Sequence, residues 1–148
     1  MIKRINRLMI GFDLALGTAA LLAPEATLRA LSHAPPSQDA RHLFQRCGPT
    51  WLTFAAAHAV AAHRGRPEDW WALAWLRATE LLTDVMWSRS PAFQGRTPRL
   101  LLRGAGAANL AMTIGFGGLA CGSASMGPGT PSGRARPVPG TPSGARPH

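Results

Sequence analysis

Charged side chains lie inside otherwise apolar stretches of this chain, and their spacing limits the chemistry they can do. Arg77, Glu80 and Asp84 are three and four residues apart in the stretch DWWALAWLRATELLTDVMW, so a helix places them on one face. Asp13 interrupts a second apolar stretch, LMIGFDLALGTAALLA. Ionisable groups in such helices normally turn inward and pair. Asp13 and Arg77 each lie midway along their stretches, so an antiparallel arrangement predicts an ion pair between them.

We expect two further arginines to pair with the acidic residues of the third stretch. Arg46 and Arg103 each enter an apolar stretch from the same side as Asp84. We therefore expect Asp84, with Glu80 deeper, to meet Arg46 or Arg103.

Two interpretations of these charges stay open. In the first, they neutralise one another and fix how the helices pack. In the second, the charged face of the third stretch and Asp13 line a polar cavity that binds a ligand or relays protons. His58 and Asn109 are single polar residues in apolar surroundings and join the set. The buried polar and ligand candidates are therefore Asp13, Arg46, His58, Arg77, Glu80, Asp84, Arg103 and Asn109.

Signatures of catalysis and of metal binding are missing from the sequence. It contains no HExxH, no Ser-His-Asp candidate set and no haem attachment motif. His58 and His63 are five residues apart and share a helix face poorly, which disfavours a bis-His haem site. Cys47 and Cys121 are too few for a disulfide framework or a metal knuckle. We predict no metal and no cofactor, and an enzyme is less expected than a binding protein.

Four stretches are long and apolar enough to cross a bilayer as helices, since a span needs roughly 20 residues. Trp70 and Trp87 flank the third stretch, and a helix separates them by about 25 Å, as aromatic belts at two membrane faces require. Pro24-Glu25 predicts the start of a short interfacial helix. The predicted fold class is all-α, a four-helix transmembrane bundle with that short helix after the first span. The predicted spans are 2–23, 41–63, 68–87 and 99–121.

The fourth span is rich in small residues. Gly104 and Ala108 are four apart, as are Ala107 and Ala111, a spacing that lets helix backbones approach closely in lipid. A soluble four-helix bundle is disfavoured because this span has no polar stripe. A cleaved signal peptide is disfavoured at the first span, since Asp13 interrupts it.

The chain divides into a membrane domain at 1–121 and a tail at 122–148. The tail is basic, rich in Pro and Gly and contains GTPSG twice, a composition typical of disorder. The formal net charge is +9 in a chain that is 46% hydrophobic and only 16% charged. Because the charge lies between apolar blocks and not along a groove or a helix face, we expect no nucleic-acid partner.

The layout resembles the small bacterial membrane proteins of the DoxX-like group and neighbouring families of unknown function. The resemblance rests on GFDLALG at 11–17, APEATLRAL at 23–31, a third span opened by PEDWW, and the small residues of the fourth span. It covers about residues 5–121 and implies a four-helix membrane bundle, sometimes linked to redox or membrane-associated complexes. It carries no functional residue to this chain.

Location and function follow as expectations. The basic N terminus and the RGR turn at 64–66 favour both termini in the cytoplasm. The resemblance implies that the membrane is a bacterial inner membrane. Its partners would be the lipid bilayer and a membrane protein or a second copy of the chain. We expect a non-enzymatic partner or small-ligand module with a charged interior. The alternative is a membrane-bound redox accessory, or a protein that handles protons or a ligand on the Arg77, Glu80 and Asp84 face.

Overall fold

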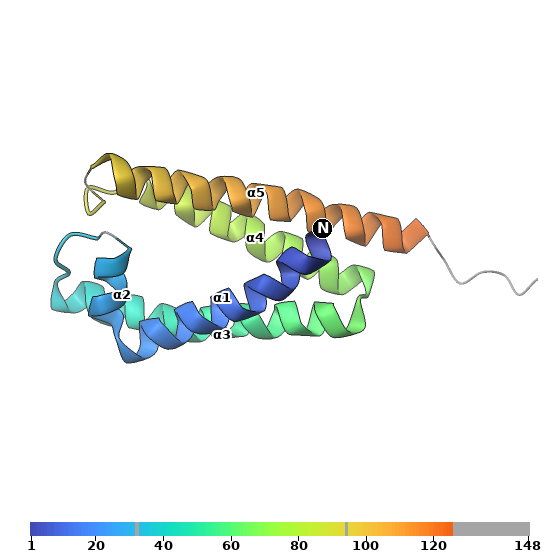
Figure 1. Cartoon of the computed structure of the whole chain (residues 1–148), viewed down its shortest axis with the longest axis horizontal. Helices are drawn as coiled ribbons and strands as arrows, with labels where there is room; N and C mark the ends of the chain where they lie inside the picture. The colour runs from blue at the N-terminus through green and yellow to red at the C-terminus, as the bar shows by residue number, and fades with distance from the viewer. Residues whose placement is uncertain (32, 94, 126–148) are drawn as a thin grey trace, which may run out of the picture.

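A computed structural model describes residues 1–31, 33–93 and 95–125, and the regular elements in these ranges are helices (Figure 1). The all-α class is confirmed, and the short second helix lies where it was predicted. The third and fifth helices begin earlier than predicted, and the fifth extends past residue 121. The rest of the predicted tail, 126–148, lies outside the described residues. The helices are α1 Ile2–Leu22, α2 Pro24–Ala30, α3 Gln38–Arg64, α4 Pro67–Trp87 and α5 Arg96–Ser125.

Local sequence signals set the ends of α3 and the start of α4. The hydroxyl of Ser37 accepts a hydrogen bond from the backbone N–H of Ala40, which caps α3 at its start. At the other end, Gly65 adopts a left-handed conformation with φ 64° and its N–H bonds to Ala61 O. Pro67 then occupies the first turn of α4, where its missing N–H costs nothing. The short connection makes α3 and α4 antiparallel neighbours.

The four long helices form two closely packed pairs, α1 with α3 and α4 with α5 (Figure 1). In the first pair the backbones nearly touch, because a Cβ on either Gly17 or Gly48 would lie 2.9 Å from the other residue's carbonyl oxygen. The first turn of α1 also reaches α5, where Ile2 lies against Gly115. At the opposite end, near α2, the two pairs diverge.

The small residues predicted to mediate helix contact in the last span do not do so. Gly104 and Ala108 are exposed, and no heavy atom lies within 4 Å of the Cβ position at Gly104. The neighbouring face of α5 packs instead, with the Cβ position at Gly106 lying 3.5 Å from Leu81. α5 is rotated about its axis, so that small residues other than the predicted ones face α4.

An apolar surface surrounds the middle of the long helices. We call the four ranges 8–22, 47–62, 70–87 and 104–122 the apolar band; none of their exposed side chains is charged. Large apolar side chains there face outward on three of the helices: Leu8 is 73% exposed, Trp75 72% and Ile114 67%. Among the described helices, α1 and the range Arg96–Gly122 are long and apolar enough to cross a membrane, so two of the four predicted spans meet this test and α3 and α4 do not.

The interior of the molecule, by contrast, holds polar side chains beside the apolar ones. Leu73, Trp70 and Phe116 form the centre of one buried cluster, with the Trp70 and Phe116 rings stacked at 5.9 Å. The buried polar and charged side chains are Asn6, Asp13, His58, Arg77 and Asn109.

Candidate functional site

The predicted Asp13–Arg77 pair is present in the middle of the structure. Arg77 Nη2 of α4 donates to Asp13 Oδ2 of α1, and the two side chains are only 3% and 1% exposed. α1 and α4 belong to different helix pairs, so this contact joins one pair to the other.

His58 of α3 lies beside the ion pair, and its hydrogen bonds define its protonation. Arg77 Nε donates to His58 Nε2 at 3.1 Å, and Arg77 Nη2 lies 2.5 Å from the same nitrogen. A nitrogen that accepts these bonds carries no proton, so the proton of a neutral imidazole is on Nδ1. There it donates to Asn6 Oδ1 at 2.5 Å, and Asn6 Nδ2 in turn donates to the backbone oxygen of His58 at 3.0 Å.

We call Asn6, Asp13, His58 and Arg77 the polar lock. Sequence reasoning missed the role of Asn6 and treated His58 as a single polar residue. A signal was present, since Asn6 and Asp13 are seven residues apart and therefore lie on one face of α1, two turns from each other.

The polar lock lies away from the three cavities described here. One positive and one negative charge neutralise each other, and the Arg77 guanidinium also lies 5.9 Å from the centre of the Phe54 ring. Asp13 Oδ1 is the one buried atom of these four side chains that has no hydrogen-bond partner. A general acid or base must reach a substrate proton, and none of the three cavities described here is lined by a residue of the lock.

The prediction that Asp84 meets Arg46 or Arg103 is wrong. Both arginines are exposed on the outside of the helices, where a long side chain can extend toward polar surroundings. Asp84 Oδ2 instead accepts a hydrogen bond of 2.8 Å from Asn109 Nδ2 of α5. Glu80 is partly buried one turn away on α4. Within the described residues, neither carboxylate has a basic group within 4.0 Å.

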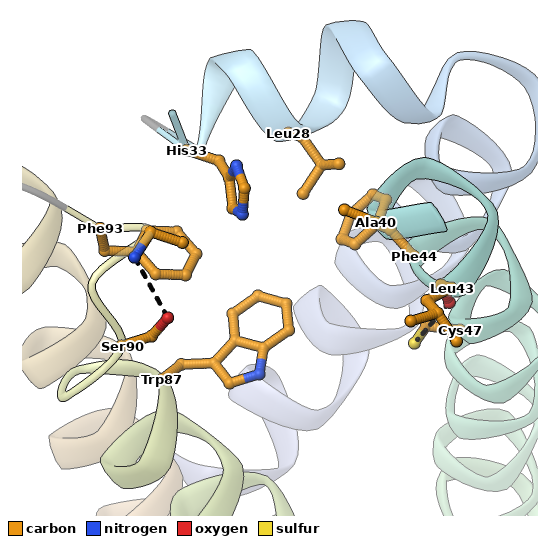
Figure 2. Close-up of a pocket in the computed structure, with 10 residues that line it drawn as sticks. Leu28, His33, Ala40, Leu43, Phe44, Cys47, Trp87, Ser90 and Phe93 are labelled. Carbon is orange, nitrogen blue, oxygen red and sulfur yellow. Dashed lines mark hydrogen bonds between the residues drawn. The ribbon is translucent and has the colours of Figure 1, made fainter. Parts of the chain in front are cut away.

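A cavity of about 250 Å³ lies where the two helix pairs diverge (Figure 2). We call it the aromatic pocket. Trp87 and Phe93 stack with their ring centres 5.4 Å apart, and His33 meets Phe93 edge-on at 5.2 Å. Phe44 of α3 and Leu28 of α2 face them across the open space.

Two loops enclose the aromatic pocket. The backbone N–H of Ala34, before α3, donates to Ala92 O, after α4, at 3.1 Å. Ser90 and His33 are the polar side chains of the wall, and Cys47 of α3 completes it. Sequence reasoning missed this pocket because His33 and Phe93 lie in irregular segments, where no periodic pattern indicates which side chains meet.

In the part of the chain that the structure describes, no group of three His, Cys, Asp or Glu side chains is placed to hold a metal ion. Cys47 and Cys121 are both free thiols. Comparisons with family models, curated proteins and solved structures find no match for this chain, so the resemblance to the DoxX-like group stays a prediction.

Proposed function

We propose that this chain is an integral membrane protein whose four long helices span the bilayer. In this proposal it is a non-enzymatic module that binds a small apolar molecule in the aromatic pocket. The observation that carries the membrane proposal is the inverted distribution of side chains. Polar and charged groups are buried, while Leu8, Trp75, Ile114 and similar residues are exposed. Soluble proteins rarely expose apolar surface this continuous.

The dimensions of the apolar band support this. Its four ranges are about 22 to 28 Å long as helices, close to the hydrocarbon thickness of roughly 30 Å. Exposed arginines lie beyond both of its edges, where they can extend to the membrane surface. The two most apolar helical stretches are only 22% and 28% buried, whereas a core helix of a soluble protein would be mostly buried.

Three of the five exposed threonines in the band also suit lipid, in which every polar group needs a partner within the protein. Thr53 donates to Pro49 O, Thr79 to Leu76 O and Thr83 to Thr79 O, all backbone oxygens of the donor's own helix. These three outward hydroxyls therefore need no water.

The polar lock explains how helices with polar faces are held in such a bundle. Arg77 makes one face of α4 polar. Asp13 on α1 neutralises its charge, and His58 on α3 accepts a hydrogen bond from it. The same contacts argue that α1 belongs to the functional protein. Removing it as a leader would take Asp13 and Asn6 away from Arg77 and His58.

The aromatic pocket supports the ligand part of the proposal. Its walls are mostly apolar and aromatic with two polar side chains, the usual composition of a small-molecule site. A volume of about 250 Å³ suits a compact apolar ligand that has one hydrogen-bonding group for His33 or Ser90.

The membrane proposal is tested by fractionation. The chain should sediment with membranes after alkaline carbonate washing and should dissolve only with detergent. Cysteine-directed labelling of the two ends in intact and opened vesicles would test the proposed inner-membrane orientation with both termini cytoplasmic. Recovery in the carbonate supernatant would refute the spanning arrangement.

The ligand proposal is tested with bromobenzene as a probe in lipid nanodiscs. Bromine quenches a nearby indole, so Trp87 fluorescence should fall along a saturable curve. Trp87→Phe should remove that saturable component, and Ala40→Phe should abolish it by filling the pocket. Trp75→Phe is the matched control, because Trp75 faces outward. Quenching that rises only linearly, as partition into lipid predicts, would refute the site.

A further inference from the structure

The acidic face of α4 is left with an uncompensated charge. The apolar band contains one basic residue, Arg77, and three acidic ones, Asp13, Glu80 and Asp84. Arg77 is engaged by Asp13, and His58 is neutral because its Nε2 accepts from the guanidinium. The net charge of the band is therefore −2, and it resides on Glu80 and Asp84.

The two carboxylates are close to one another, and they share Arg77 as a nearby positive group that is already paired with Asp13. They are one helical turn apart on α4 and both partly buried, so their side chains share one face. The groups that interact with Glu80 include Arg77, Asp84, Trp51 and Cys47 and, more weakly, Asp13. No described basic group lies within 4.0 Å of either carboxylate, since Arg77 has its short contacts with Asp13 and His58.

A second observation concerns a buried amide on the neighbouring helix. Asn109 of α5 is only 8% exposed, and its Nδ2 donates to Asp84 Oδ2 at 2.8 Å. Its amide oxygen Oδ1 is buried and has no hydrogen-bond partner. The unpartnered oxygen belongs to the same amide as the nitrogen that contacts Asp84. A buried acceptor without a partner costs about 1 to 3 kcal/mol.

We propose that Glu80, Asp84 and Asn109 form a binding site for one hard divalent cation. The donor set consists of oxygen atoms, two carboxylates and one amide carbonyl, which Ca²⁺ and Mg²⁺ prefer over softer metals. One divalent ion cancels the charge of −2 and gives Asn109 Oδ1 a partner. Water completes the coordination, as it does for Mg²⁺ sites built on one or two carboxylates. Asp84 lies less than a turn from the end of α4 at Trp87, which provides a short path from the membrane surface.

The test is thermal unfolding of the full chain in detergent after treatment with EDTA. CaCl₂ and MgCl₂ are compared in separate titrations, each with choline chloride at matched ionic strength. Binding to the folded state should raise Tm continuously with the logarithm of cation concentration above Kd. Glu80→Gln and Asp84→Asn should each remove most of that rise. Glu68→Gln, an exposed site on the same helix, should keep it.

Two further measurements distinguish cation binding from other effects on Tm. Direct binding of radioactive Ca²⁺ to each purified variant does not depend on its Tm. Asn109→Asp should increase the response, because it adds a third carboxylate. A Tm rise no larger than with choline, or one equally large in Glu80→Gln, would overturn the site. Stabilisation by acid with no divalent response would also overturn it, because protons would then neutralise the carboxylates.

Discussion

Replacing Arg77 by Leu should be among the most damaging single changes in this chain. The substitution introduces an apolar side chain of similar helix preference, but it leaves Asp13 charged and buried and removes the donor to its Oδ2, the oxygen that had a partner. It also leaves His58 Nε2 without a donor. Removing one member of a buried ion pair typically costs about 3 to 5 kcal/mol. We expect a loss of that size in the free energy of unfolding.

The second member of the pair provides the decisive comparison. Asp13→Asn in the Arg77→Leu background removes the stranded charge and leaves a neutral amide in its place. The double variant should therefore be more stable than Arg77→Leu alone, although it lacks both members of the ion pair. The stability of Arg77→Lys should lie between that of the native chain and that of Arg77→Leu, because a single ammonium group cannot bond Asp13 and His58 with the geometry of a guanidinium.

The measurement is reversible unfolding in mixed micelles, followed by tryptophan fluorescence and by circular dichroism. Arg46→Leu is the matched control, since it removes an exposed arginine and should change stability by no more than about 0.5 kcal/mol. Equal losses for Arg77→Leu and Arg46→Leu would refute the lock as a source of stability. A double variant as unstable as the sum of its single changes would refute the pairing.

Three further changes test neighbouring parts of the argument. Asn6→Ala should cost about 1 to 3 kcal/mol in the same unfolding assay, because His58 Nδ1 and the His58 backbone oxygen lose their partners; no loss would remove Asn6 from the lock. Gly17→Ala should separate α1 from α3 and cost about 1 to 3 kcal/mol, whereas Gly11→Ala, with open space around it, should not destabilise. Ile114→Arg should cost about 2.5 to 3.5 kcal/mol in a membrane-insertion assay; insertion as efficient as that of the native α5 would contradict a lipid-facing position.

The Asp13–Arg77 pair could be predicted because it depends on little more than depth. Each residue lies midway along its helix, so the two side chains reach the same depth whichever way the helices run. The pairing of Asp84 could not be predicted in the same way. It depends on how α3 and α5 are rotated about their axes, and those rotations turn Arg46 and Arg103 outward.

The aromatic pocket shows a second limit of sequence reasoning. Its walls come from α2, α3, the end of α4 and two loops, so no helical periodicity connects them. The start of α3 was missed for a smaller reason. Ser37 caps the helix, but the predicted span began at Arg41 and left out residues 38–40.

The uneven spacing of the helix pairs has a mechanical consequence. The pairs are fastened at mid-depth by Arg77, whereas at the diverging end the loops are joined by the Ala34–Ala92 backbone bond. The connection between the two pairs is therefore stiffer at Arg77 than at the loops. If the loops part, the α4–α5 hairpin can tilt about Arg77 and widen the entrance beside Trp87, while Asp13 keeps its partner. A guest could then enter sideways from the lipid without disturbing the charges at the centre.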